Sequence, residues 1–133
     1  MAATNPSTVV NFDADAARAA ALDVAGDDLL LVVEFDRRSF NPLYLTDRVR
    51  EYYDDEAAMA RHFEEIHSYI YLDFTERDLY EDLYPPAGES RAFATYLEEF
   101  VALRVLFDGE GLFLALAPDA DVTGVVGAVE GAA

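Results

Sequence analysis

The sequence predicts an α+β fold with a mostly antiparallel sheet of about five strands covered by helices. Apolar, β-prone segments joined by short polar turns are typical of β-hairpins. Other segments carry apolar residues at helical spacing. The chain has 133 residues, 53% of them hydrophobic, which suffices for one domain with a real core. We therefore expect the order helix, two strands, helices, three strands and helix, in a single domain over 12–133 that follows a loose polar segment over 1–11.

The first predicted elements are a helix and a hairpin. Residues 13–24 are rich in Ala, and Asp13 is a plausible N-cap for a helix there. The apolar run 29–35 and the segment 40–45 are separated by a charged turn, so we expect them to pair as two strands. Proline cannot donate a backbone hydrogen bond, so Pro42 places the second strand at an edge or a bulge.

The centre of the chain is helical in character. Thr46 is predicted to cap a short helix, and Asp54 or Asp55 to cap the next one. Four apolar residues of that second helix follow spacings of four, three and four, which is the pattern of a face turned to the core. These residues are Met59, Phe63, Ile66 and Ile70. A further helix is predicted to start at Thr75, and the Pro-Pro-Ala-Gly sequence at 85–88 ends the helical region.

The last part of the chain predicts three strands and a helix. Residues 91–96 alternate in a strand-like pattern, and 100–107 and 111–117 are strongly β-prone. The Asp-Gly pair at 108–109 is a favourable hairpin turn between the last two strands. A final helix is expected over 120–130.

Charge is the strongest compositional signal. The chain has 27 acidic and 9 basic residues, all nine of them Arg, and its net charge is -18. Such a chain repels itself in dilute buffer, whereas at molar salt the Debye length falls to about 3 Å and screens the repulsion. In this respect the sequence resembles haloarchaeal proteins, and we expect a cytoplasmic protein of a high-salt cell.

Composition also excludes several function classes. There is no Cys, so disulfides, Cys-ligated zinc, iron–sulfur clusters and thiol catalysis are ruled out. The Arg residues lie among acidic neighbours and form no basic patch, which disfavours direct nucleic-acid binding. No apolar run reaches the length of a membrane span, and the first ten residues lack the pattern of a signal peptide.

The two histidines do not predict a metal site. His62 and His67 are five residues apart, which on a helix turns one away from the other by roughly 140°. A zinc-binding helix instead needs His at i and i+4. We therefore expect no metal, no cofactor and no catalytic group, and interpret the scattered carboxylate pairs as a solvated surface.

Aromatic residues are the main candidates for a partner or ligand surface. Tyrosine offers apolar area with a polar tip and is enriched at interfaces. Six tyrosines lie in the helical centre of the chain, and two further aromatics lie in the strand 40–45, which we expect at an exposed sheet edge. The candidates are Tyr52, Tyr53, Tyr69, Tyr71, Tyr80, Tyr84, Phe40 and Tyr44. The simpler interpretation, that these side chains pack the helices onto the sheet, is favoured by roughly two to one because aromatics most often serve the core.

Two resemblances add to this interpretation. The predicted element order is similar to that of roadblock, longin and profilin-like domains, and the roadblock resemblance implies a dimerising scaffold that docks small GTPases or other signalling proteins. Separately, four stretches of the sequence resemble a family of small uncharacterised haloarchaeal proteins. This resemblance implies the kind of cell in which the protein occurs and no particular activity. These stretches are 32–36, 43–45, 47–53 and 112–119.

Three hypotheses for function remain open. The first is a non-catalytic protein-interaction or regulatory module that forms a homodimer, which a flat exposed aromatic patch would favour. The second is a small-molecule sensor, which would need a closed apolar cavity with an inward Arg61, Arg77 or Arg91. The third is an enzyme that uses His67 together with a carboxylate in a cleft.

Overall fold

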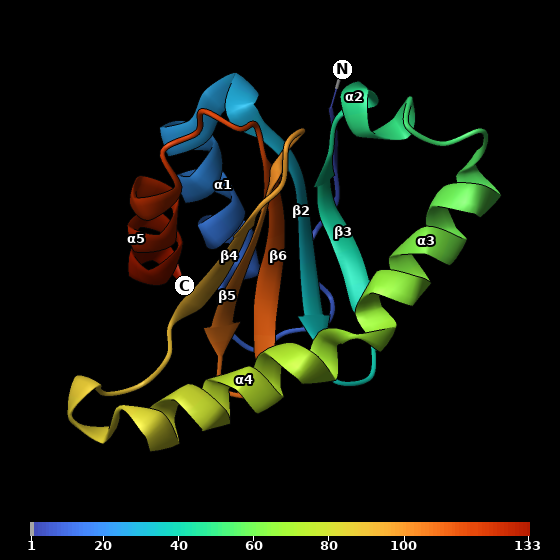
Figure 1. Ribbon diagram of the computed structural model, residues 1–133. Coiled ribbons are helices and arrows are strands. Elements are labelled where there is room, and N and C mark those ends of the chain that lie inside the picture. Colours follow the sequence, from blue (N-terminus) through green and yellow to red (C-terminus); the bar gives the residue numbers. More distant parts are fainter. Residues whose placement is uncertain (1) are drawn as a thin grey trace.

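The computed structural model describes residues 2–133 and contains one antiparallel sheet of six strands (Figure 1). The order across the sheet is β1-β3-β2-β6-β5-β4. The strands are β1 (Ala3–Thr4), β2 (Leu29–Asp36), β3 (Phe40–Leu45), β4 (Ala92–Tyr96), β5 (Val101–Phe107) and β6 (Glu110–Leu116). The predicted α+β class with an antiparallel sheet is therefore confirmed, and β1 adds one strand to the five expected.

Helices lie on both faces of this sheet. The helices α1 (Ala14–Ala25) and α5 (Val122–Ala132) lie side by side on one face, and the other helices form an arm along the opposite face (Figure 1). The arm contains α2 (Asp47–Arg50), α3 (Glu56–Ser68) and α4 (Ile70–Leu83). Two short 3₁₀ turns, η1 (Gly26–Asp28) and η2 (Pro85–Ala87), complete the chain.

The central strand β2 supplies side chains to both layers of the core. Alternation along a strand sends successive side chains to opposite faces. Val32 packs in the cluster that includes Ala17 of α1 and Val125 of α5, whereas Val33 packs in the cluster of Phe63 on α3. Because β2 lies between β3 and β6, its hydrophobic run is buried on both faces and at both edges.

Small residues let α1 lie close to the sheet. Ala14, Ala17 and Ala21 are fully buried at spacings of three and four, which places them on one helical face. The predicted cap is confirmed, since the Asp13 carboxylate accepts a hydrogen bond from the backbone N–H of Ala16 at 3.0 Å. The last helix starts slightly later than predicted, because Asp121 caps α5.

The N-terminal segment is hydrogen-bonded to the sheet. This corrects the expectation that residues 1–11 are loose, for the described residues 2–11. Its anchor is the fully buried carboxylate of Glu34, which accepts hydrogen bonds from the Ser7 hydroxyl at 2.6 Å and the Thr8 N–H at 2.7 Å. The Val10 N–H and the Asn41 amide also donate to it, at 3.2 and 2.8 Å. Sequence reasoning missed this anchor because a single Glu in an acidic chain gives no sign that it is buried.

Burial and hydrogen bonding have opposite effects on Glu34. Burial alone raises the pKa of a carboxyl group, because it disfavours the charged form. The donors from Ser7, Asn41, Thr8 and Val10 outweigh burial and hold the pKa of Glu34 below its ordinary value. The carboxylate is therefore ionised and fully used as an acceptor inside the protein.

The bulge predicted in the second strand is confirmed. Val32 pairs with Tyr44 and Val33 pairs with Pro42, so Leu43 is an extra residue on β3. The strand is not at the edge of the sheet, however, because β1 pairs with its outer side.

Two predicted helix starts are confirmed and one is wrong, although the side-chain cap expected at Thr46 does not form. Thr46 precedes α2, but its hydroxyl donates to the Leu30 carbonyl at 2.8 Å and does not cap the helix. Thr75 lies inside α4, where its hydroxyl donates to the Tyr71 carbonyl one turn earlier. Asp55 caps α3 as predicted, by accepting from the Ala58 N–H at 2.7 Å. Serine and threonine make such local bonds both at helix starts and within helices, so their presence alone does not fix a boundary.

We predict that Gly111→Ala destabilises the fold, whereas Gly127→Ala does not. A Cβ on Gly111 would lie 2.6 Å from both the Phe35 ring and the Val105 carbonyl oxygen, so the sheet would have to shift. The expected cost is about 1–3 kcal/mol of unfolding free energy. A Cβ on Gly127 in α5 meets nothing within 4 Å, and alanine there should add about 0.5–1 kcal/mol through helix propensity. Denaturant unfolding of both variants in high salt checks this, and equal effects would contradict it.

We predict that Glu34→Gln destabilises the protein at neutral pH by about 1–3 kcal/mol, because an amide presents N–H groups to donors that need an acceptor. The native carboxylate has a lowered pKa, so its stabilisation is present above its ordinary value of 4.5 and is lost as pH falls through the folded value. The difference between wild type and variant should therefore shrink below about pH 4.5. Unfolding curves across pH measure it, and a constant difference would argue against the anchor.

Candidate interaction surface

The α4 helix is attached to the sheet by few buried side chains. Phe74 is its only residue below a tenth exposed, and it packs edge-on against Phe35 with ring centroids 6.2 Å apart. The guanidinium of Arg37 lies 4.3 Å from the centre of the Phe74 ring, so it covers that ring with a cation–π contact. Phe74 is therefore the buried aromatic anchor of α4, and the partly buried Ile70 packs against the same cluster.

Polar contacts fix the remaining length of α4. Asp73 forms an ion pair with Arg104 on β5 at 3.3 Å, and both side chains are largely buried. Arg77 pairs with Glu81 at 3.2 Å and also donates to the Asp108 carbonyl at 2.6 Å. Burial raises the pKa of Asp73 above its ordinary value, and Arg104 offsets only part of this effect.

Several large apolar side chains of α4 and of Tyr84, which directly follows it, are exposed. Leu79, Leu83 and Tyr84 are each more than half exposed, and Leu72 and Tyr80 are more than two-fifths exposed. We call these five residues the outer α4 surface. Exposed large apolar side chains can mark an interaction site, and these five stand out on a chain that carries a net charge of -18.

Tyr80 joins the outer α4 surface to the edge strand β4. Its ring lies 6.1 Å from that of Phe93 on β4 and stacks at 6.2 Å on Tyr84. Figure 1 shows α4 running on past β4 before the chain returns through η2. The apolar surface of the helix therefore continues onto the sheet edge.

The β4 strand is the last strand on its side of the sheet and pairs only with β5. Its exposed residues include Tyr96, and Leu97 is exposed directly after the strand. None of its five residues is charged or Pro, and its register with β5 contains no bulge. The usual devices that keep an edge strand from pairing are thus missing from β4.

The structure divides the eight aromatic residues predicted from sequence into two groups. Tyr52, Tyr69, Tyr71, Tyr80 and Tyr84 are exposed, all on α2, α3 or α4 or at their ends. Tyr53, Phe40 and Tyr44 are partly buried and pack against the core clusters. Only Tyr80 and Tyr84 belong to the outer α4 surface, so the candidates do not form one continuous patch.

The strand at 40–45 is not an exposed edge, which corrects that part of the prediction. The N-terminal segment covers it, with the Asn5 N–H donating to the Leu43 carbonyl at 3.0 Å and β1 pairing with Tyr44 and Leu45. The open edge is β4, which sequence reasoning did not single out. Strand order decides which strand is last, and no local pattern reveals it.

The two histidines have separate structural contacts. His62 shares a 2.6 Å hydrogen bond with the Tyr53 hydroxyl, and burial raises the pKa of Tyr53. His67 donates from Nε2 to the Asp36 backbone carbonyl at 2.8 Å, which fixes the junction of α3 and α4 to the end of β2. Within residues 2–133, no three side chains of the ligand types His, Asp and Glu gather closely enough to hold a metal ion.

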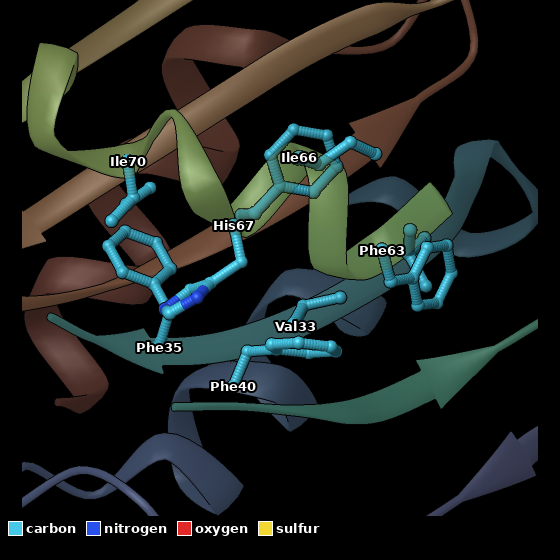
Figure 2. Close-up of a pocket in the computed structure, with 9 residues that line it drawn as sticks. Val33, Phe35, Phe40, Phe63, Ile66, His67 and Ile70 are labelled. Atoms are coloured by element: carbon cyan, nitrogen blue, oxygen red, sulfur yellow. The ribbon is translucent and has the colours of Figure 1, made fainter. Parts of the chain in front are cut away.

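A small apolar cavity lies between the arm and the sheet (Figure 2). Its volume is about 40 Å³, and its lining includes Phe40, Phe63, Ile66, His67 and Ile70. No Arg lines it. Small-molecule sites usually measure about 300–1,000 Å³, so this cavity is a packing gap under the α3–α4 junction.

We predict that the effect of Asp73→Asn depends on pH with the opposite sign to that of Glu34→Gln. The pKa of Asp73 is raised in the fold, so its contribution to stability is greatest at low pH and falls as pH rises above the ordinary value of 3.8. The cost of Asp73→Asn should therefore grow as pH falls. Unfolding measurements over the same pH series check this. A cost that shrinks in acid would show that the ion pair with Arg104 outweighs the effect of burial on the Asp73 carboxylate.

Comparison with known proteins gives a family and no activity. No curated protein matches this chain. None of the helices in the described part of the chain is long and apolar enough to cross a membrane. One family, described as Domain of unknown function (DUF7522), matches residues 8–133, which takes in every element from α1 to α5. The chain therefore belongs to the DUF7522 family.

Proposed function

We propose that this protein is a non-catalytic interaction module that self-associates in the cytoplasm of a high-salt cell. The observation that carries the proposal is the outer α4 surface together with the uncharged edge strand β4 beside it. Apolar side chains that are exposed in one chain gain free energy when a partner removes them from water.

The charge of the chain supports the high-salt part of the proposal. A net charge of -18 makes two copies repel in dilute buffer, whereas molar salt screens charges beyond about 3 Å. Apolar association is strengthened by salts that are excluded from the protein surface. A carboxylate-rich protein that exposes apolar side chains on α4 is thus suited to associate where salt is abundant.

The alternatives receive less support. A sensor pocket would need an inward Arg, but Arg77 pairs with Glu81 and Arg91 pairs with Glu130. Arg61 is exposed on α3. An enzyme that uses His67 would need a carboxylate hydrogen-bonded to it, whereas the ring of His67 bonds to the backbone carbonyl of Asp36. The carboxylate of Asp36 instead accepts hydrogen bonds from the backbone N–H groups of Arg38 and Ser39.

We predict that the wild-type protein is a dimer at about 2 M KCl, where the Debye length is only a few Å. Light scattering should give twice the chain mass of 14.7 kDa, which is 29.4 kDa. A mass of one chain at every accessible concentration would contradict self-association.

The outer α4 surface should contribute to this dimer. Tyr80→Ala with Tyr84→Ala should raise the dissociation constant by about tenfold or more, as expected when aromatic interface anchors are truncated. Tyr52→Ala is the matched control, because Tyr52 is 78% exposed but follows α2, away from α4. Equal effects of both changes would argue against a role for this surface.

A further inference from the structure

We propose that a second copy of this chain adds to β4, strand against strand and antiparallel, about a two-fold axis at Ala94. The inference rests on the proposed self-association and names the surface and geometry by which it occurs. The result is one continuous sheet of twice six strands, twelve in all.

The free hydrogen-bonding groups of β4 set the register. The Leu106 N–H donates to the Arg91 carbonyl, and the Leu97 N–H donates to the Phe100 carbonyl. Bonding to a neighbouring strand alternates along an antiparallel pair. The odd-numbered residues 91–97 therefore bond to β5, and the N–H and C=O groups of Ala92, Ala94 and Tyr96 point away from the sheet.

These outward groups can all pair with a copy of themselves. An antiparallel strand centred on Ala94 faces Ala94 with the partner's Ala94, and Ala92 with the partner's Tyr96. Each such pair exchanges two backbone hydrogen bonds. A two-fold arrangement of this kind uses the same patch on both copies and closes on itself.

The side chains of β4 are complementary in size in this register. Tyr96 lies opposite the small Ala92 of the other copy, and Phe93 lies opposite Thr95. The large residue of each pair thus meets a small one, and Ala94 meets its own copy at the axis. An aromatic residue paired with a β-branched residue across strands, as Phe93 is with Thr95, stabilises a sheet.

The α4 helix would contribute to the same contact. Tyr80 touches Phe93 on β4, and α4 continues past the strand on this face of the sheet (Figure 1). A strand added to β4 would extend the sheet beside the outer α4 surface. The exposed helix and the open edge are thereby explained by one partner.

A single introduced cysteine tests the geometry, because the natural chain has no Cys. In Ala94→Cys the two cysteines would lie directly opposite each other, with Cα atoms about 5.5 Å apart, which a disulfide can bridge. In Ala92→Cys, the matched control on the same face of the same strand, they would lie four residue steps apart, about 14 Å. We expect mild oxidation at about 2 M KCl to cross-link most of Ala94→Cys and little of Ala92→Cys.

The mass and the cross-link separate the two proposals. A wild-type dimer whose Ala94→Cys variant stays uncross-linked, or cross-links no better than Ala92→Cys, overturns the β4 pairing and leaves self-association standing. A wild-type monomer overturns both. Circular dichroism and denaturant unfolding of the reduced variants confirm that each is folded, so that failure to cross-link reports on geometry.

Discussion

The structure depends on the burial of β2 on both faces of the sheet. A strand that is apolar on both sides cannot lie at a surface, so each face needs its own cover. The helices α1 and α5 cover one face with small and branched residues, while α3 and α4 cover part of the other with aromatic residues. The rest of the architecture follows from this requirement, including the long central excursion that carries the chain from β3 to β4.

The two covers differ in character. On the first face, the fully buried alanines of α1 and the valines of α5 form a continuous layer over the centre of the sheet. On the second face, Phe63 and Phe74 anchor an arm that exposes several large apolar side chains. A layer of the first kind stabilises a domain, and an arm of the second kind presents a surface. The proposed function assigns the first to folding and the second to association.

Much of the fold could be predicted from local patterns, because its elements have strong local signals. The run 29–35, the Asp-Gly turn at 108–109 and the capping residues Asp13 and Asp55 all act within a few residues of themselves. What could not be predicted depends on contacts between distant segments. Glu34 is buried because residues 7–10 supply donors, and Thr46 fails to cap because Leu30 accepts its hydroxyl. The candidate surface shows the same division. The sequence marks Tyr80 and Tyr84 as candidates but favours a core role for them, whereas the structure exposes both, and the open edge at β4 depends on strand order.

The buried carboxylate of Glu34 bears on where this domain begins. Similarity to the family starts at residue 8, whereas Ser7 supplies the shorter side-chain bond to Glu34 and β1 lies earlier still. A fragment that begins at residue 8 would leave the ionised Glu34 carboxylate in the interior without the Ser7 donor. It would also lack β1, so the outer side of β3 would be unpaired. The folding unit is thus longer than the region of recognisable similarity. Trimming or fusing at residue 8 would remove part of the architecture and expose a second edge of the sheet.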